Sequence, residues 1–116
     1  MKEKDRPRKL ISTTYETEAG SWIGSTPVKV KLLVTVGVYR RRPFEVFVKS
    51  SLYTANIVSN CEEVGRLVSL GLRYGIPAEL IIKQLKNIQG SREDVGSIGD
   101  AVAKILQSYV KPEKGL

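Results

Sequence analysis

The sequence predicts an α+β fold, in which a small antiparallel sheet in the N-terminal half carries about three helices from the C-terminal half on one face. Two observations support this prediction. Residues 28–38 and 44–49 alternate between apolar and other side chains, which is the period of a β-strand. After residue 51 the apolar side chains recur every three or four positions instead, which is the period of a helix.

The N-terminal segment contains an arm, a strand and a turn. Residues 1–8 alternate positive and negative charge around a proline and are expected to form a flexible basic arm. Residues 9–17 are rich in β-branched side chains and predict the first strand. Residues 20–27 collect glycine, serine, threonine and proline around one large apolar side chain, Trp22, and are expected to be a turn.

The clearest strand covers residues 28–38, where valine or leucine occupies every second position. A short connection at 39–43 separates it from a strand at 44–49. Two alternating runs so close together predict an antiparallel hairpin. Both faces of the second strand carry aromatic side chains, so we expect each face to be partly covered. The tip of the hairpin carries three basic side chains, Arg40, Arg41 and Arg42.

The first predicted helix carries an apolar stripe between residues 61 and 72 and ends at Gly75. Its start is capped by one of three residues, Thr54, Ser59 or Asn60. The second helix begins at Pro77 and ends at Gly90. Its expected buried residues are Leu80, Ile81, Leu85 and Ile88.

Residues 90–99 are polar and glycine-rich and are expected to form a loop. The third helix is expected to begin at Ser97 or Asp100 and to end at Val110. Its inward-facing residues are expected to be Ile98, Val102, Ile105, Leu106 and Tyr109.

The composition limits the function classes. The chain has 116 residues, a length that suits one domain, and a net charge of +7. It contains no histidine and one cysteine. Histidine is the commonest general base and metal ligand, so we expect neither an enzyme nor a metal or cofactor site. No apolar stretch is long enough to cross a bilayer and the N-terminus is charged, so we expect no membrane contact, no secretory signal and a cytoplasmic location.

The three hairpin arginines have two interpretations. They either keep a sheet edge solvated or form a phosphate-binding finger, because guanidinium groups match phosphate oxygens. Further cations that could extend this field are Lys2, Lys4, Arg6, Arg8, Lys9, Lys111 and Lys114. Tyr39 and Phe44 flank the arginines, but Phe44 is expected in the core, which weakens the case for a surface that stacks RNA bases.

Other single residues also have alternative roles. Arg66 either pairs with Glu62 or Glu63 on its own helix, or is a half-buried cation that faces the sheet and is available to Glu45 or to a ligand anion. Lys83 has the same ambiguity. A further set has simple structural interpretations: Asp100 compensates a helix dipole, Cys61 is a small buried side chain, and Gly65 and Gly71 allow close helix packing.

Five segments in order resemble the TSCPD domain, found at the C-terminus of adenosylcobalamin-dependent ribonucleotide reductases and as a free-standing protein. They are Arg6-Pro7-Arg8 with Thr14-Tyr15, Leu33-Val34-Thr35-Val36, Arg42 to Lys49, Glu62 to Leu70, and Ile82 to Ile88. The resemblance implies that residues 9–110 form one TSCPD-like domain, with a tail at 111–116.

The chain departs from the family at its cysteines. The Thr-Ser-Cys-Pro-Asp motif aligns with residues 96–100, where Ile98 holds the cysteine position. The other family cysteines align with Gly90-Ser91 and near Ala19-Gly20, and Cys61 matches none of them. A zinc-binding thiolate cluster or redox pair is therefore expected to be lost, and the reductase barrel is expected to be absent.

The expected function is therefore a non-catalytic binding or regulatory module, with a nucleotide or a ribonucleotide reductase subunit as its partner by resemblance. The alternatives are a nucleic-acid-binding protein and a protein that sequesters a small phosphorylated signal. The expected phosphate- or ligand-binding residues are Arg40, Arg41, Arg42, Lys49, Arg66 and Lys83.

We also expect a homodimer or a higher oligomer. Three helices cover one face of a sheet, which leaves Leu33 and Phe47 exposed beside Trp22. A symmetric dimer would bury these residues and bring two arginine-tipped hairpins together. Alternatively, the N-terminal arm folds back over them.

Overall fold

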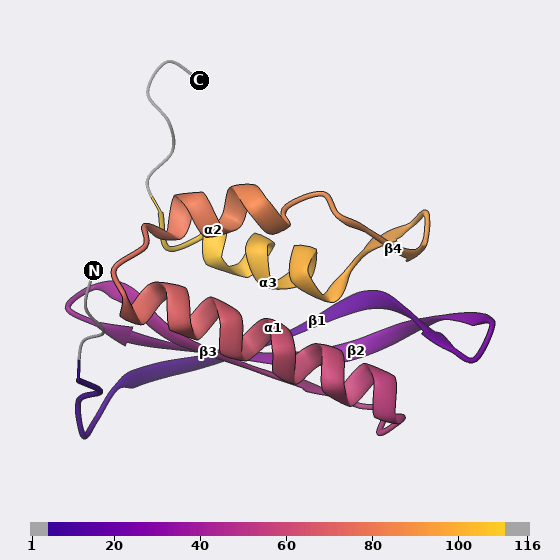
Figure 1. Cartoon of the computed structure of the whole chain (residues 1–116), viewed down its shortest axis with the longest axis horizontal. Coiled ribbons are helices and arrows are strands. Elements are labelled where there is room, and N and C mark those ends of the chain that lie inside the picture. Colours follow the sequence, from indigo (N-terminus) through magenta and orange to yellow (C-terminus); the bar gives the residue numbers. More distant parts are fainter. Residues whose placement is uncertain (1–4, 111–116) are drawn as a thin grey trace, which may run out of the picture.

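The computed structural model describes residues 5–110 and has the predicted α+β architecture (Figure 1). An antiparallel sheet in the order β1-β2-β3 is formed by the N-terminal half. A second sheet of two short strands and three helices come from the C-terminal half. The elements are β1 (Ile11–Ile23), β2 (Thr26–Tyr39), β3 (Arg42–Ser50), α1 (Ala55–Arg73), α2 (Ala78–Leu85), β4 (Gln89–Arg92), β5 (Val95–Gly96) and α3 (Ile98–Gln107).

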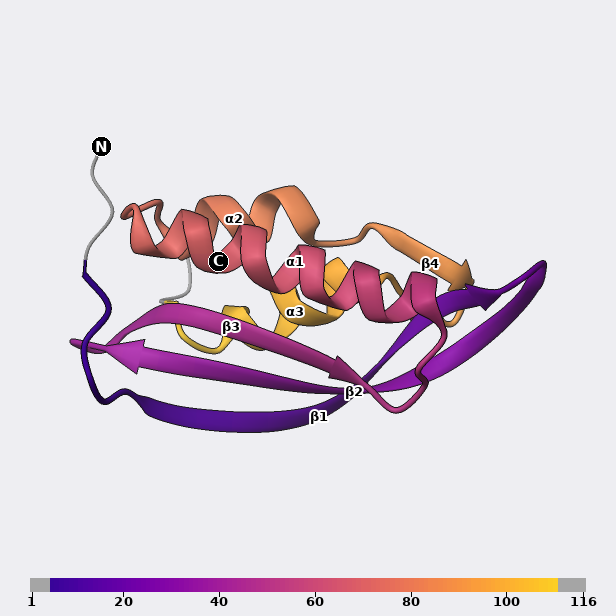
Figure 2. The same ribbon diagram turned by 60° about the horizontal axis from the view of Figure 1, so that its bottom comes forward.

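The helices lie on one face of the three-stranded sheet, as predicted, and the core fills the space between the two layers (Figure 2). Alternate residues of β2 point into this space because side chains alternate along a strand. The fully buried β2 residues are Val30, Leu32, Val34 and Val36. They pack with helical residues such as Ile57, Cys61, Val68, Ile82, Val102 and Leu106.

The first strand is longer than predicted. The expected turn at 20–27 was wrong, because β1 continues to Ile23 and only Gly24 and Ser25 form the turn before β2. Gly20 stays in the strand opposite Lys29, and on its other side it lies against Ser91 of β4. The absence of a side chain at Gly20 therefore lets β1 and β4 lie close together.

The predicted β2–β3 hairpin is confirmed. Val34 pairs with Val48 and Val36 with Val46, so these apolar side chains share the core-facing side. The register shifts between Gly37 and Val38, and the strands join through a turn at residues 40–41.

Helix α1 begins after Thr54, one of the three predicted caps, although the Thr54 hydroxyl makes no capping hydrogen bond. Gly75 follows the end of the helix with a φ of 85°, the left-handed conformation expected just beyond a helix C-terminus. The predicted buried position of Cys61 is confirmed. Gly71 lies against Ile81, so it permits the expected close packing with α2.

Two predictions for the following segment were wrong. Helix α2 ends at Leu85, where the expected end was Gly90, and its buried residues are Ala78 and Ile82, while Leu80 and Ile88 are exposed. Residues 90–99 contain the hairpin of β4 and β5 and the start of α3, where a loop was expected. This hairpin forms because β4 packs beside β1.

Helix α3 begins directly after Ser97, one of its two expected starts, and the Ser97 hydroxyl caps it by accepting a hydrogen bond from the Asp100 N–H. Asp100 lies in the first turn as expected, and its carboxylate also accepts from the Asn87 N–H at 2.7 Å. The helix ends three residues before Val110. Beyond the end of α3, the hydroxyl of Tyr109 shares a hydrogen bond with that of Tyr15 in β1. Burial and this hydrogen bond together raise the pKa of Tyr109 to about 12.

The sheet face opposite the helices carries the apolar side chains expected there. Leu33 is 46% exposed and Phe47 is 54% exposed. The N-terminal segment crosses part of this face, where Leu10 touches Gly37, but it leaves both side chains open. Trp22 lies far along the strands from them, because it pairs with Pro27 while Leu33 pairs with Glu16.

None of the helices in the described part of the chain is long and apolar enough to cross a membrane.

Candidate functional site

A groove of about 830 Å³ runs along the seam between strand β3 and helix α1, and we call it the β3–α1 groove. Strand β3 forms an edge of the sheet, and α1 lies against that edge. Aromatic and charged side chains that line it are Phe47, Lys49, Tyr53, Glu62, Arg66 and Arg73.

The floor of the groove is set by a close approach of α1 to the edge of β3. A Cβ atom on Gly65 would lie 3.2 Å from the Val46 carbonyl oxygen, so any larger residue there would push the helix outward. One turn later, the buried Ser69 hydroxyl accepts a hydrogen bond from the Val46 N–H and donates one to the Val46 carbonyl. These contacts satisfy edge groups that would otherwise be unpaired.

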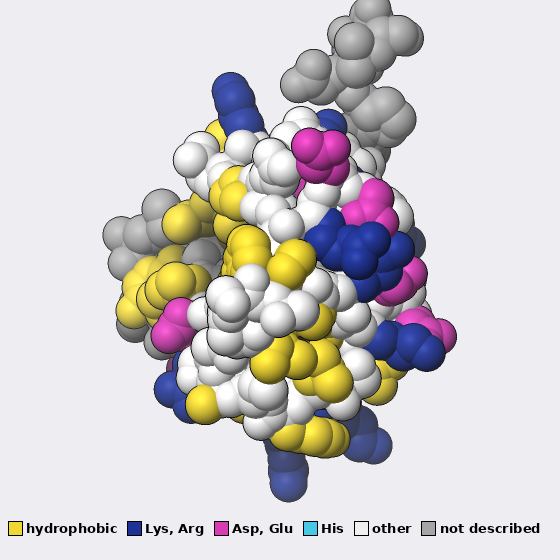
Figure 3. Space-filling model, turned by 90° about the vertical axis from the view of Figure 1, so that its right-hand side faces the viewer, with side chains coloured by type: hydrophobic (Ala, Val, Ile, Leu, Met, Phe, Trp, Pro, Cys, Tyr) yellow, Lys and Arg dark blue, Asp and Glu magenta, His cyan; other side chains and the backbone are white. Residues whose placement is uncertain are grey.

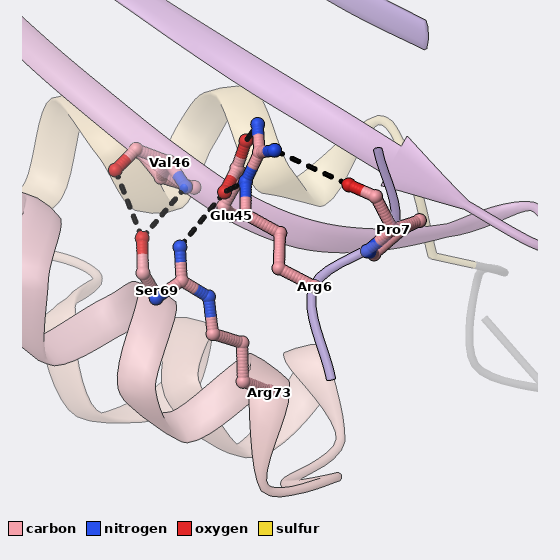
Figure 4. A network of polar contacts seen from close by, with 6 residues as sticks. All are labelled: Arg6, Pro7, Glu45, Val46, Ser69 and Arg73. Carbon is pink, nitrogen blue, oxygen red and sulfur yellow. Dashed lines mark hydrogen bonds and ion pairs between the residues drawn. The ribbon is translucent and has the colours of Figure 1, made fainter. Parts of the chain in front are cut away.

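A buried carboxylate fixes one end of the groove. Glu45 is 2% exposed and binds two guanidinium groups, from Arg6 in the N-terminal segment and from Arg73 at the end of α1 (Figure 4). Each of these arginines approaches a carboxylate oxygen to 2.8 Å. The hydrogen bonds from Arg6 lower the pKa of Glu45 and Arg73 lowers it further, although burial acts in the opposite direction.

Two of the predicted ligand residues, Lys49 and Arg66, are brought to this groove. Arg66 pairs with Glu62 at 2.5 Å, which confirms the first interpretation of this side chain. The expected half-buried position beside Glu45 was wrong, because the Arg66 side chain is 79% exposed and Glu45 is bound by Arg6 and Arg73. Binding of a ligand anion by Arg66 stays a prediction.

The groove also carries exposed aromatic and apolar surface. Phe47 contributes from β3, and Tyr53, which is 87% exposed, stands in the connection before α1. Leu67 and Leu70 line the helical side and are exposed as well. Tyr53 and Arg73 were not predicted from the sequence as site residues. The signal for Arg73 was the unpaired acid at Glu45, which needs a cation once it is buried.

The hairpin arginines lie outside the groove. Arg40 and Arg41 occupy the turn with φ values of 52° and 66°, and with Arg42 they are exposed. The guanidinium of Arg40 stacks over the Tyr39 ring at 5.1 Å from its centre, and Tyr39 packs edge-on against buried Phe44. Lys83 lies on α2 and does not line the groove.

Of the terminal cations named in the sequence analysis, Arg6, Arg8 and Lys9 are described, and only Arg6 forms an ion pair with a described residue. Four others lie outside the described residues, namely Lys2, Lys4, Lys111 and Lys114.

A second cavity, of about 380 Å³, gathers the positions that align with the family cysteines. Gly20, Gly90 and Ile98 all line it, and Trp22 stands at the same cavity. A Cβ atom on Gly90 would lie 2.6 Å from the Gly96 carbonyl oxygen and 3.0 Å from the Gly20 Cα. Close backbone packing therefore occupies the space that thiolate side chains would need, and these residues do not fit a zinc site.

The only cysteine lies elsewhere. Cys61 is buried on α1, and burial raises the pKa of its thiol, which disfavours the reactive thiolate. Within residues 5–110, no three histidine, cysteine, aspartate or glutamate side chains gather as metal ligands. The β3–α1 groove itself presents aromatic faces, cations and one acid, Glu62.

Comparison with protein families gives a match to the model described as TSCPD domain, over residues 2–110. The corresponding comparisons with curated proteins and with solved structures found no match.

Proposed function

The chain belongs to the TSCPD domain family, and from that premise we propose that it is a non-catalytic module that binds a nucleotide in the β3–α1 groove. The observation that carries this proposal is the combination of two exposed aromatic side chains with cations on the rim of one groove. The groove volume of about 830 Å³ lies within the range of small-molecule sites, which is roughly 300–1,000 Å³.

The base of the nucleotide could stack on either of two aromatic side chains in the groove. Phe47 offers a ring that is 54% exposed, and Tyr53 is more exposed still. Stacking of a base on an aromatic side chain contributes about 1–3 kcal/mol, and it needs no particular hydrogen-bond pattern. Leu67 and Leu70 supply apolar surface on the opposite side of the groove.

Lys49 and Arg66 are the cations of the groove that would bind the phosphates of the nucleotide. Arg66 already pairs with Glu62, but both side chains are more than half exposed, so that pair contributes about 1 kcal/mol or less. Arg66 therefore loses little free energy when it exchanges the Glu62 carboxylate for a phosphate. Its planar guanidinium can bind two phosphate oxygens at once. Arg73 stays committed to Glu45.

The resemblance to the C-terminal domain of adenosylcobalamin-dependent ribonucleotide reductases supports the same ligand class, because the substrates of those enzymes are nucleotides. A reductase subunit remains the expected macromolecular partner by the same resemblance. Within this scheme the chain binds and presents a nucleotide without changing it.

Isothermal titration with ATP, dATP and ADP tests the proposal. We expect binding that Phe47→Ala and Arg66→Ala each weaken by about tenfold, which corresponds to roughly 1.4 kcal/mol. Two matched controls, Leu80→Ala and Lys86→Ala on and after α2, should leave the affinity unchanged, because these residues are exposed away from the groove. The nucleotide should be recovered intact after incubation.

Two outcomes would overturn the proposal. One is the absence of binding by all three nucleotides at millimolar concentration. The other is an equal loss of affinity in the groove variants and the controls. Hydrolysis of the nucleotide at a rate that Arg66→Ala abolishes would contradict the non-catalytic role.

A further inference from the structure

The excess positive charge of the described residues is gathered at one end of the molecule. Among the described residues there are fifteen basic and ten acidic side chains, a net charge of +5. One end carries the segment at 5–9, the turn of the β2–β3 hairpin, and the end of α1 with Glu45, and we call it the basic end. Its seven cations are Arg6, Arg8, Lys9, Arg40, Arg41, Arg42 and Arg73.

The basic end holds two acids, Asp5 and Glu45, so it accounts for the whole net charge of the described residues. The rest of the described chain has eight basic and eight acidic side chains. Five of these basic side chains form ion pairs, such as Lys29 with Asp94 and Lys31 with Glu16. Figure 3 views the opposite end of the molecule, where Lys and Arg side chains lie beside Asp and Glu.

The contacts of the structure hold these segments together. Arg6 reaches Glu45, and Leu10 packs against Gly37, so the N-terminal segment runs beside the base of the hairpin. Arg8 and Lys9 are exposed and lie between these two anchors. Figure 1 shows the N-terminal segment, the hairpin turn and the end of α1 at the same end of the molecule.

The hairpin arginines are exposed and have no acidic partner among residues 5–110. None of Arg40, Arg41 and Arg42 forms an ion pair with a residue in the described range 5–110. Arg40 and Arg41 are consecutive with positive φ, the conformation of a two-residue turn that most side chains avoid. Both positions favour asparagine or glycine on conformational grounds, so two arginines there indicate a role for their charge.

We propose that the basic end binds double-stranded nucleic acid through its phosphates, without base recognition. The turn stands at the end of the three-stranded sheet, where Ile11 of β1 pairs with Val38 just before it, so the arginines face outward from a broad end of the molecule. Guanidinium groups bind phosphate oxygens in pairs. The aromatic rings beside the arginines are engaged with each other and with Arg40, which leaves no free platform for unpaired bases in this part of the described structure. A duplex backbone therefore fits this surface better than a single strand.

The test is fluorescence anisotropy with a mixed-sequence DNA duplex of about 20 base pairs at several salt concentrations. If the hairpin arginines with Arg8 and Lys9 neutralise about five phosphates, affinity should fall on the order of 10²–10³-fold between about 50 and 200 mM salt. The double variant Arg40→Asn with Arg41→Gly suits the turn and removes two charges. It should reduce the slope of log K against log salt by about 2.

The matched control removes the same net charge elsewhere. Lys83→Gln with Lys86→Gln changes two exposed cations outside the basic end and should leave the slope unchanged. The proposal fails if no duplex binding is detected at about 50 mM salt, or if the control lowers the slope as much as the hairpin variant. It also fails if the single strand binds more tightly than the duplex, or if anionic lipid vesicles bind and the duplex does not. Nucleotide binding in the β3–α1 groove is a separate measurement, and the hairpin variant should not affect it.

Discussion

The hydroxyl of Ser69 accepts a hydrogen bond of 2.9 Å from the Val46 N–H and donates one of 3.0 Å to the Val46 carbonyl oxygen. A helix side chain thereby replaces the neighbouring strand that an edge strand lacks. Edge strands with free N–H and C=O groups are sites for pairing with other chains. Here, α1 closes the edge of β3 at its centre, and Gly65 lets the helix come close enough to do so.

We predict that Ser69→Ala lowers the free energy of unfolding by about 1–3 kcal/mol, because it leaves two buried backbone groups without partners. It should also increase aggregation, since the edge becomes available for strand pairing. Denaturant unfolding and light scattering measure the two effects. Ser59→Ala, an exposed serine on the same helix, is the control and should change neither. Equal stability of the two variants would show that the Ser69 contacts contribute nothing.

The carboxylate of Glu45 predicts a pH dependence of stability. Arg6 and Arg73 hold the pKa of Glu45 below its ordinary value of 4.5, so the folded state binds a proton less readily than the unfolded state. The stabilisation is therefore complete above pH 4.5 and is lost as the pH falls through the lower folded pKa.

We expect Glu45→Gln to lower the free energy of unfolding by about 1.5–3 kcal/mol at neutral pH, the range for hydrogen bonds to charged groups. The difference from the unmodified chain should shrink when the pH is lowered to about 3. Glu62→Gln breaks only the surface pair with Arg66 and should change stability by about 0.5 kcal/mol or less. A difference for Glu45→Gln that stays constant with pH would contradict the assigned pKa direction.

The turn of the basic end gives a stability prediction of its own. Left-handed conformation costs an ordinary L residue about 1–2 kcal/mol, and both Arg40 and Arg41 adopt it. Arg40→Asn with Arg41→Gly should therefore raise the free energy of unfolding by about 1–2 kcal/mol and raise the Tm by several degrees. Thermal unfolding followed by circular dichroism measures this.

The opposite variant sharpens that test. Arg40→Val with Arg41→Val places two β-branched residues at positive φ and should destabilise the chain. If both double variants melt at the same temperature, the turn conformation carries no cost and the argument from strain is lost.

The β2–β3 hairpin could be predicted because its signal is local, an alternation of apolar residues around a short connection. The β4–β5 hairpin could not, because it depends on Gly20 and Ser91, which are far apart in the sequence and meet only in the fold. The composition of residues 20–27 and 90–99 favoured a turn and a loop, and the pairing between strands overrode that preference.

The candidate site was predictable in part for the same reason. Lys49 and Arg66 were identified from their charge and their place beside apolar positions. Their meeting in one groove depends on α1 lying against the edge of β3, which no local pattern encodes. The partners of Glu45 were missed because Arg6 and Arg73 come from two distant segments.

The last prediction concerns the open face of the sheet. Thr35 pairs with Phe47 and Leu33 with Lys49, so Leu33 and Phe47 are diagonal neighbours on the face without helices. Diagonal side chains on a sheet lie roughly 7–8 Å apart, close enough to form one patch. A symmetric dimer would bury Leu33 and the side of Phe47 that faces Leu33, while the other side of the Phe47 ring still lines the β3–α1 groove. We expect sedimentation at micromolar concentration to give twice the chain mass of 12.9 kDa.

Leu33→Asp is the informative variant, because Leu33 does not line the β3–α1 groove whereas Phe47 does. A carboxylate at the centre of the interface would have no partner there and should dissociate the dimer. Leu80→Asp introduces the same charge at a leucine that is 52% exposed on α2, and it should leave the mass unchanged. A 12.9 kDa species for the unmodified chain would rule out the dimer, and dissociation by Leu80→Asp alone would move the interface to the helical layer.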